Sequence, residues 1–116
     1  MEASILVVDD DAGFLRVAAQ LLARDGMNVV ATAETAAAGL AAAHEHRPDA
    51  ALVDVGLPDR DGIDLGRELA ALPWTPRVVL TSSDRDAAGL AARGDGLPFV
   101  PKEDLPTAPL RELLTG

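Results

Sequence analysis

Five short apolar runs, separated by stretches of helical period, constrain the fold of this chain more than any other feature. The runs cover residues 5–8, 28–31, 50–53, 77–80 and 97–101. Helical spacing of apolar residues covers residues 12–24, 34–45, 63–72 and, more weakly, 84–93. This alternation is typical of βαβ units around a parallel sheet. A chain of 116 residues is long enough for one such domain and too short for two.

The end of the chain predicts one more short helix. Thr107 is a suitable N-cap, and Leu110, Leu113 and Leu114 follow it at helical spacing. Five strands with intervening helices predict a doubly wound, flavodoxin-like α/β fold with helices on both faces, whose common strand order is 2-1-3-4-5. Ligands of such sheets bind outside the carboxyl ends of the strands, so the residues that close the runs are the candidates for function.

Charged residues close three of the apolar runs. Asp9 and Asp10 follow the first run, Asp54 follows the third, and Lys102, the only lysine of the chain, follows the fifth. Thr81 follows the fourth run. Because the carboxyl ends of parallel strands meet at one edge of a sheet, three carboxylates and one ammonium are predicted to meet there. This combination indicates a magnesium and phosphoryl site.

The predicted chemistry follows from these residue types. Mg²⁺ prefers oxygen ligands and takes one or two carboxylates together with water and phosphate oxygens. Asp10 and Asp54 are candidate carboxylate ligands, Asp9 can hold a coordinated water, and the carbonyl of Gly56 can fill a further position. With charge neutralised by a metal, Asp54 can act as a nucleophile on a phosphoryl donor and form an acyl phosphate.

Two further side chains complete the predicted site. Lys102 supplies a point charge for the phosphoryl oxygens, and the Thr81 hydroxyl can donate a hydrogen bond to one of them. If the phosphoryl group draws Thr81 inward, the loop after the fourth strand must move. Phosphorylation would then act as a local change of charge with a remote effect on packing.

The composition limits the classes of partner that the chain could bind. The chain has 19 acidic and 10 basic residues and a formal charge of −9, which argues against direct binding to nucleic acid or to an anionic membrane. It has no cysteine, so disulfide and thiolate chemistry are excluded. The first residues lack the basic region and long apolar stretch of a signal peptide or membrane span. We therefore expect a cytoplasmic protein.

Four motifs together resemble the receiver domain of response regulators, the family of two-component signalling. They lie at residues 5–11, 53–62, 78–81 and 99–102 and span almost the whole chain. The resemblance implies a domain that catalyses its own phosphorylation and dephosphorylation without an external turnover substrate. The implied donor is a phosphohistidine on a histidine kinase or a histidine phosphotransfer protein.

The resemblance also implies a role for each candidate residue. Asp54 would be the phosphoacceptor, and Phe99 would be the switch aromatic. Asp9 and Asp10 would be the metal pair, and Gly56 would be the backbone ligand. Thr81 would be the switch hydroxyl, and Lys102 would be the phosphoryl-binding cation. A partner, or a second copy of the chain in a homodimer, is expected on the face formed by the fourth helix, the fifth strand and the last helix.

The sequence departs from the family pattern at three positions. Glu103 replaces the proline that usually follows the lysine, so a carboxylate could compete for the ammonium there. Ser82 replaces the usual alanine after the threonine and adds a hydroxyl near the site. Gly56 leaves no side chain two residues after the acceptor, which predicts easier access of water and a shorter phosphorylated lifetime.

Other functions remain open at the level of sequence. A small metal-dependent phosphohydrolase with an aspartyl-phosphate intermediate would need a second acid near the nucleophile, and Gly56 occupies the obvious place for it. An interaction module that is never phosphorylated would have no need of the acidic pair, the acceptor and the lysine together. No output domain is visible, so the chain is either a receiver that acts alone or part of a longer regulator.

Overall fold

A computed structural model describes residues 2–83 and 96–115 and contains a five-stranded, all-parallel sheet. The strand order is β2-β1-β3-β4-β5, which confirms the order predicted from the sequence. The strands are β1 Ser4–Val8, β2 Asn28–Ala33, β3 Ala50–Asp54, β4 Arg77–Ser82 and β5 Phe99–Pro101.

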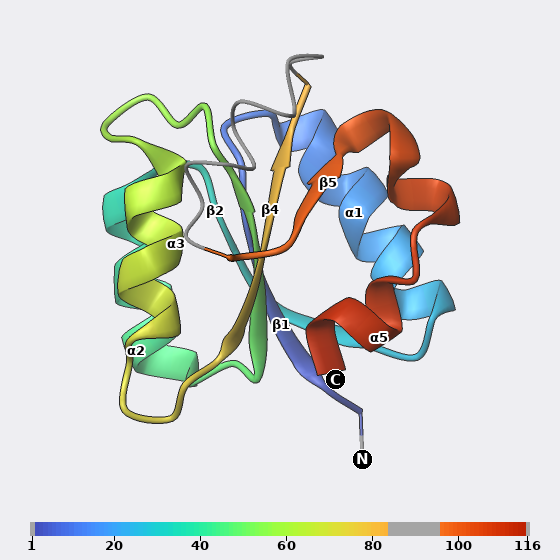
Figure 1. The fold of residues 1–116 in the computed structure, drawn as a ribbon, viewed down its shortest axis with the longest axis horizontal. Helices are drawn as coiled ribbons and strands as arrows, with labels where there is room; N and C mark the ends of the chain where they lie inside the picture. The colour runs from blue at the N-terminus through green and yellow to red at the C-terminus, as the bar shows by residue number, and fades with distance from the viewer. Residues whose placement is uncertain (1, 84–95, 116) are drawn as a thin grey trace.

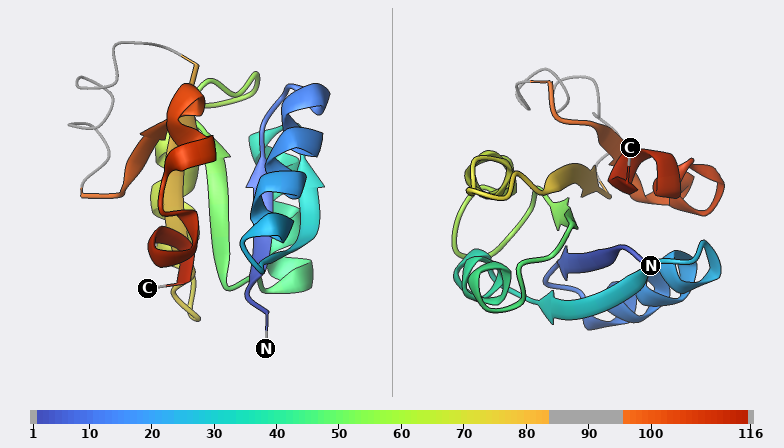
Figure 2. Two further views of the ribbon diagram at one scale, coloured as in Figure 1. Left: turned by 90° about the vertical axis from the view of Figure 1, so that its right-hand side faces the viewer. Right: turned by 90° about the horizontal axis from the view of Figure 1, so that it is seen from below.

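The helices cover both faces of this sheet, as Figures 1 and 2 show. One side carries α2 and α3, and the other carries α1, α5 and the 3₁₀ helix η1. Their bounds are α1 Ala12–Arg24, α2 Ala36–His46, α3 Gly62–Ala70, η1 Lys102–Thr107 and α5 Leu110–Thr115. The helix predicted over residues 84–93 lies outside the described residues.

Strand alternation divides the core into two apolar clusters. On β1, Ile5 and Val7 pack with α1 and α5, whereas Leu6 and Val8 pack with α2 and α3. All four side chains are fully buried. A strand with both faces covered therefore reads as a continuous apolar run, which is the pattern expected of a parallel sheet between two helical layers.

Side chains set the ends of the first helix. Asp11 caps α1, since its Oδ1 accepts hydrogen bonds from the backbone N–H groups of Gly13 at 2.9 Å and Phe14 at 3.3 Å. After the helix, Gly26 has a φ of 81°, a left-handed conformation that glycine adopts without steric cost. Asp11 and Gly26 thus mark the two ends of α1.

The end of the chain differs from the prediction. Thr107 does not cap a helix, because it lies in η1 and its hydroxyl donates to the carbonyl of Asp104 at 3.2 Å. The first bond of α5 instead joins the Leu113 N–H to the Pro109 carbonyl at 3.0 Å, so this helix begins later than predicted. The 3₁₀ turns after Lys102 include Thr107, the residue that was predicted to cap the helix.

No helix within residues 2–83 and 96–115 has the length and apolar character needed to cross a membrane.

Candidate functional site

The register of the sheet brings the predicted site residues to one level. Val8 pairs with Val53, so Asp9 and Asp54 follow neighbouring positions, and Asp54 itself pairs with Thr81. Thr81 in turn pairs with Val100, two residues before Lys102. The carboxyl ends of β1, β3, β4 and β5 therefore supply one site, as the strand order requires.

Asp9 is the most buried charged residue of the described chain. It is fully buried, and its backbone N–H donates to the Ala33 carbonyl at 2.9 Å. One carboxylate oxygen, Oδ1, accepts the N–H of Asp11 at 2.8 Å, and the other, Oδ2, lies 2.7 Å from the Lys102 ammonium. Oδ1 is thus hydrogen-bonded to the start of α1, whereas Oδ2 forms an ion pair with Lys102 and has no hydrogen-bond partner among the described residues.

Asp54 is held in a less favourable environment. It is 6% exposed, and burial, followed by the neighbouring charge of Asp9, raises the pKa of its carboxyl above the ordinary value. The N–H of Gly56, which donates to Oδ1 at 3.2 Å, and the charge of Lys102 oppose that rise in pKa. Its Oδ2 lies 3.7 Å from the Lys102 ammonium. A further cation near Asp54 would relieve this carboxylate.

Lys102 is held between carboxylates and an aromatic ring. Its ammonium contacts Asp9 and Asp54 and lies 4.3 Å from the centre of the Phe14 ring. A cation at that distance from a ring face is attracted by the ring quadrupole. Glu103, which was predicted to compete for the ammonium, is exposed to solvent. The ammonium therefore faces into the site.

Thr81 presents an unused hydroxyl to this site end of the sheet. The residue is fully buried, and its Oγ1 has no hydrogen-bond partner among the described residues. Its carbonyl accepts the Val55 N–H at 3.0 Å, so the backbone is fixed while the hydroxyl stays available. A buried polar atom without a partner is costly, which makes it a candidate to receive a ligand oxygen.

Asp10 completes a group of three carboxylates. It is exposed, and the ligand oxygens of Asp9, Asp10 and Asp54 lie within 4.8 Å of one another. A hard divalent cation such as Mg²⁺ suits this donor set, because it prefers oxygen ligands and retains several waters. Lys102 is the one close cation among residues 2–83 and 96–115, and a divalent ion would bring the formal charge of these four groups to zero.

The loop after β3 carries Gly56, the predicted backbone ligand. The loop closes where the Gly62 N–H donates to the Val55 carbonyl at 3.0 Å. A Cβ at Gly62 would lie 2.0 Å from the carbonyl oxygen of Asp54, so only glycine permits this close approach. Asp61 then caps α3 through the Ile63 N–H at 2.8 Å. The loop is thus closed by the bond between Gly62 and Val55, and it continues directly into α3.

Phe99 and Ser82 lie on the two strands beyond Asp54. Phe99 is half-buried, pairs with Leu80 in the sheet and packs against the apolar cluster of α2 and α3. Ser82 is buried at the end of β4, next to Thr81. Both residues neighbour the threonine in the sheet, but the role of Phe99 as a switch remains a prediction.

Two residues near the site were not predicted from the sequence. Phe14 was assigned to the apolar face of a helix, and its spacing carries no sign of contact with Lys102. Asp59 binds two backbone N–H groups of α2, those of Ala36 and Ala37, at 2.8 and 3.0 Å. Because those partners lie 23 and 22 residues earlier in the chain, no local pattern could have indicated this contact.

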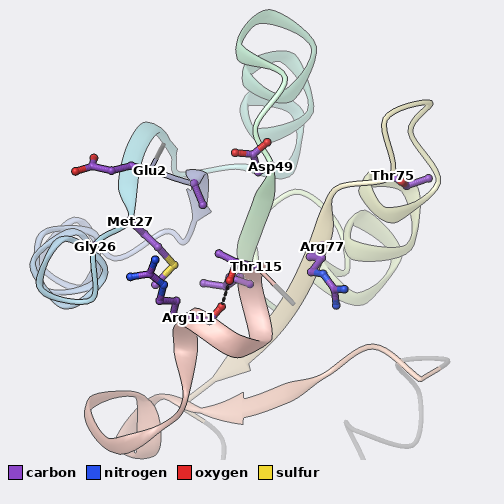
Figure 3. Close-up of a pocket in the computed structure, with 10 residues that line it drawn as sticks. Glu2, Gly26, Met27, Asp49, Thr75, Arg77, Arg111 and Thr115 are labelled. Atoms are coloured by element: carbon purple, nitrogen blue, oxygen red, sulfur yellow. Dashed lines mark hydrogen bonds between the residues drawn. The ribbon is translucent and has the colours of Figure 1, made fainter.

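A pocket lies at the opposite end of the sheet, between the amino ends of the strands and α5 (Figure 3). This pocket has a volume of about 450 Å³, and Asp49, Arg77 and Arg111 are its charged residues beside Glu2. The backbone N–H and hydroxyl of Ser4 donate to Asp49 at 2.9 and 3.2 Å. None of the predicted site residues lines this pocket.

Comparisons with known proteins show the family of the chain. The model of the response regulator receiver domain family matches residues 5–104. The KDP operon transcriptional regulatory protein KdpE of Escherichia coli is 36% identical over 93 residues, which are 80% of this chain and 41% of that protein. The chemotaxis protein CheY of Bacillus subtilis is 33% identical over 79 residues, which are 68% of this chain and 66% of that protein.

Solved structures give the same result for the fold. A CheY-like response regulator receiver domain protein from Methanospirillum hungatei superposes with a TM-score of 0.73 at 25% identity, over 90% of this chain and 88% of that one. A two-component response regulator of the LuxR family from Aurantimonas superposes with a TM-score of 0.84 at 23% identity, over 96% and 81% of the two chains. The chain spans less than half the length of the KdpE relative.

Proposed function

Because the chain belongs to the response regulator receiver domain family of two-component systems, we propose that Asp54 is its phosphoacceptor. One observation carries this assignment: the buried Asp54 carboxylate lies between Lys102 and the acidic group formed with Asp9 and Asp10. Burial, followed by the charge of Asp9, raises the pKa of this carboxyl, and a divalent cation beside it would stabilise the ionised form that attacks phosphorus.

In the proposed reaction a carboxylate oxygen of Asp54 attacks the phosphorus of a phosphohistidine. The new bond joins that oxygen to phosphorus, while the bond from phosphorus to the donor imidazole nitrogen breaks and its electron pair returns to the imidazole. Lys102 binds a phosphoryl oxygen, and the unpartnered hydroxyl of Thr81 donates to another. Mg²⁺, held by Asp9, Asp10, Asp54 and the Gly56 carbonyl, would supply charge neutralisation.

The donor and the response extend the proposal beyond this chain. A histidine kinase or a histidine phosphotransfer protein in the cytoplasm would supply the phosphoryl group. Movement of Thr81 toward that group would be read on the face that includes β5 and α5, with Phe99 as the switch aromatic. The transcriptional regulatory protein KdpE is longer than this chain, so an output function would reside in a further part of a protein of that kind.

The alternative of a phosphohydrolase with an external substrate has weaker support. Such an enzyme needs a general acid or base beside the nucleophile. Gly56, two residues after Asp54, offers no side chain, and Lys102 is already paired with Asp9. An interaction module that is never phosphorylated would keep buried, mutually repelling carboxylates for no purpose.

The test is the intact mass of the folded chain after incubation with acetyl phosphate, with and without Mg²⁺. We expect the gain of one phosphoryl group only when Mg²⁺ is present, and no gain for Asp54→Asn. Asp49→Asn is the matched control, because Asp49 directly precedes the same strand and its carboxylate accepts hydrogen bonds only from Ser4 among the described residues.

Phosphorylation of Asp54→Asn to the same extent as the native chain would refute the assignment. If no adduct is seen on any variant, release of inorganic phosphate from acetyl phosphate decides between fast hydrolysis and absence of the reaction. Absence of both adduct and phosphate release would refute the phosphoacceptor function.

A further inference from the structure

The loop that carries Gly56 is hydrogen-bonded to a distant helix through the side chain of Asp59. The Asp59 carboxylate accepts the Ala36 N–H through Oδ1 at 2.8 Å and the Ala37 N–H through Oδ2 at 3.0 Å. Both donors belong to the first turn of α2, whose N–H groups have no partner within the helix. Two hydrogen bonds to one carboxylate therefore connect the loop to the start of α2.

We propose that Asp59 is a positioning residue for the metal site, because its bond to α2 fixes the loop that presents the Gly56 carbonyl. This inference rests on the proposed function, which makes the Gly56 carbonyl a magnesium ligand. Asp59 touches neither the metal nor the phosphoryl group, and it acts through the backbone of residues 56–59.

The residues next to Gly56 make few contacts that could fix the position of its carbonyl. Gly56 is exposed and has no side chain that could pack against the protein. Its N–H makes one bond, to Asp54 Oδ1, at 3.2 Å. Leu57 is half-buried against the cluster of α2 and α3 and supplies an apolar contact. Between this contact and the cap at Asp61, two side chains bond outside the loop: Arg60 donates to Glu68 of α3 at 2.9 Å, and Asp59 accepts from α2. Of the two, only Asp59 bonds to backbone groups, and it lies nearer to Gly56 in the chain.

The charge of Asp59 agrees with such a role. The two bonds from the Ala36 and Ala37 N–H groups lower the pKa of its carboxyl, so the carboxylate is fully ionised at neutral pH. An ionised carboxylate at the N-terminus of a helix is also favoured by the helix dipole. The same bond therefore orders the helix start and the loop.

Thr35 offers a matched control on the same helix. Its hydroxyl caps α2 by accepting the Ala38 N–H at 3.1 Å and, among the described residues, makes no hydrogen bond to the loop. Thr35→Ala and Asp59→Ala both remove acceptors from the first turn of α2, but only the second frees the loop. Asp59→Asn retains an acceptor and removes the charge, so we expect it to lie between the native chain and Asp59→Ala.

The first measurement is hydrogen exchange of backbone amides in the metal-free chain. In Asp59→Ala we expect faster exchange at Ala36, at Ala37 and also at Gly56. In Thr35→Ala we expect faster exchange at Ala38 and no change at Gly56. Unchanged exchange at Gly56 in Asp59→Ala, with protection lost at the α2 amides, would overturn the inference.

The second measurement is the Kd of Mg²⁺ by calorimetry for the same variants. We expect Asp59→Ala to raise the Kd by about three- to tenfold, at or below the low end of the range seen when groups behind metal ligands are removed. Thr35→Ala should leave the Kd unchanged, and an equal rise in both variants would overturn the positioning role.

The two measurements also separate this inference from the proposed function. If the native chain binds no Mg²⁺, the proposed metal site fails, and with it the effect of Asp59 on that site. The exchange rate of Gly56 would still decide whether Asp59 fixes the loop. If the native chain binds Mg²⁺ and Asp59→Ala binds it equally well, the proposed function stands and only the inference fails.

Discussion

Strand β3 carries an aspartate at each end, and their surroundings differ in a way that separates a reactive site from a structural contact. Asp54 ends the strand in a buried place next to Asp9, and burial raises its pKa. Asp49 precedes the strand, is exposed, and accepts two hydrogen bonds from Ser4. One carboxylate would gain from a cation, whereas the other is already satisfied.

The cationic side chains at the two ends of the sheet also differ in burial and in their contacts. Lys102 is 18% exposed in its side chain and contacts two buried carboxylates and an aromatic ring. Arg77 and Arg111 are exposed at the opposite pocket, where Arg111 donates to the carbonyl of Asp25 at 3.3 Å. The comparison teaches that the count of charged residues does not identify a site, whereas burial and unpaired groups do.

The largest expected effect concerns a glycine at each end of the sheet, Gly62 and Gly26, at which an added Cβ would meet a close neighbour. Gly62→Ala places a Cβ 2.0 Å from the Asp54 carbonyl oxygen, so the loop or α3 must shift. We expect a loss of at least about 3 kcal/mol in the free energy of unfolding, as in severe overpacking. Urea unfolding followed by the fluorescence of Trp74, the only tryptophan, measures this loss.

Gly26→Ala is the counterpart at the amino end. There a Cβ meets the end of the flexible Arg111 side chain at 3.0 Å, and the φ of 81° adds strain. We expect a smaller loss of about 1–2 kcal/mol, the cost of a left-handed conformation for alanine. Equal losses for the two variants would contradict the difference between the ends.

The second effect concerns the cations. Lys102→Met removes the charge that faces Asp54 and should slow phosphorylation by acetyl phosphate about 100-fold, as loss of one preorganised electrostatic contact does. The time course of intact mass measures the rate, and circular dichroism checks the fold. Arg77→Met should leave the rate unchanged. A native rate in Lys102→Met would remove this lysine from the proposed mechanism.

The third effect is that substitutions of the two aspartates change the free energy of unfolding in opposite directions. Without metal at neutral pH, Asp54→Asn should raise the free energy of unfolding by about 1–2 kcal/mol, because it removes a charge from a buried place. Asp49→Asn should lower it slightly, because it weakens the bonds from Ser4. Urea unfolding of both variants gives the two signs.

The pH dependence of this effect follows from the raised pKa of Asp54. A carboxyl whose pKa is higher in the folded chain contributes stability below the unfolded value of 3.8, and this contribution is lost as the pH rises through the folded pKa. The advantage of Asp54→Asn should therefore shrink as the pH falls toward 3.8. A constant difference across that range would contradict the assignment of the effect to charge.

The smallest effect is the acid dependence of the Asp59 contact. Its pKa is lowered, so its contribution to stability is complete above the ordinary value of 3.8 and is lost as the pH falls through the lowered pKa. The native chain should exceed Asp59→Asn in stability at neutral pH, and the difference should close only below that value. Thermal unfolding at several pH values measures it, and a difference that closes near neutral pH would point to another group.

The strand order and the meeting of Asp9, Asp54 and Lys102 could be predicted because both depend on position along the chain. Each charged residue follows an apolar run, and a parallel sheet places such residues at one edge. The start of α5 could not be placed, since the choice between a cap at Thr107 and 3₁₀ turns depends on packing after Lys102. The contacts of Phe14 and Asp59 depend on which helix faces which loop, and local spacing does not carry that information.

The pocket at the amino end bears on how this fold can be combined with others. Glu2, Ala3 and Thr115 all line it, so both ends of the chain leave the molecule beside one another (Figures 1 and 3). A domain whose ends are adjacent can be inserted into a host loop or permuted circularly with little distortion. Anything attached at either end would emerge on the side opposite Asp54, so the molecule separates a face for attachment from a face for chemistry.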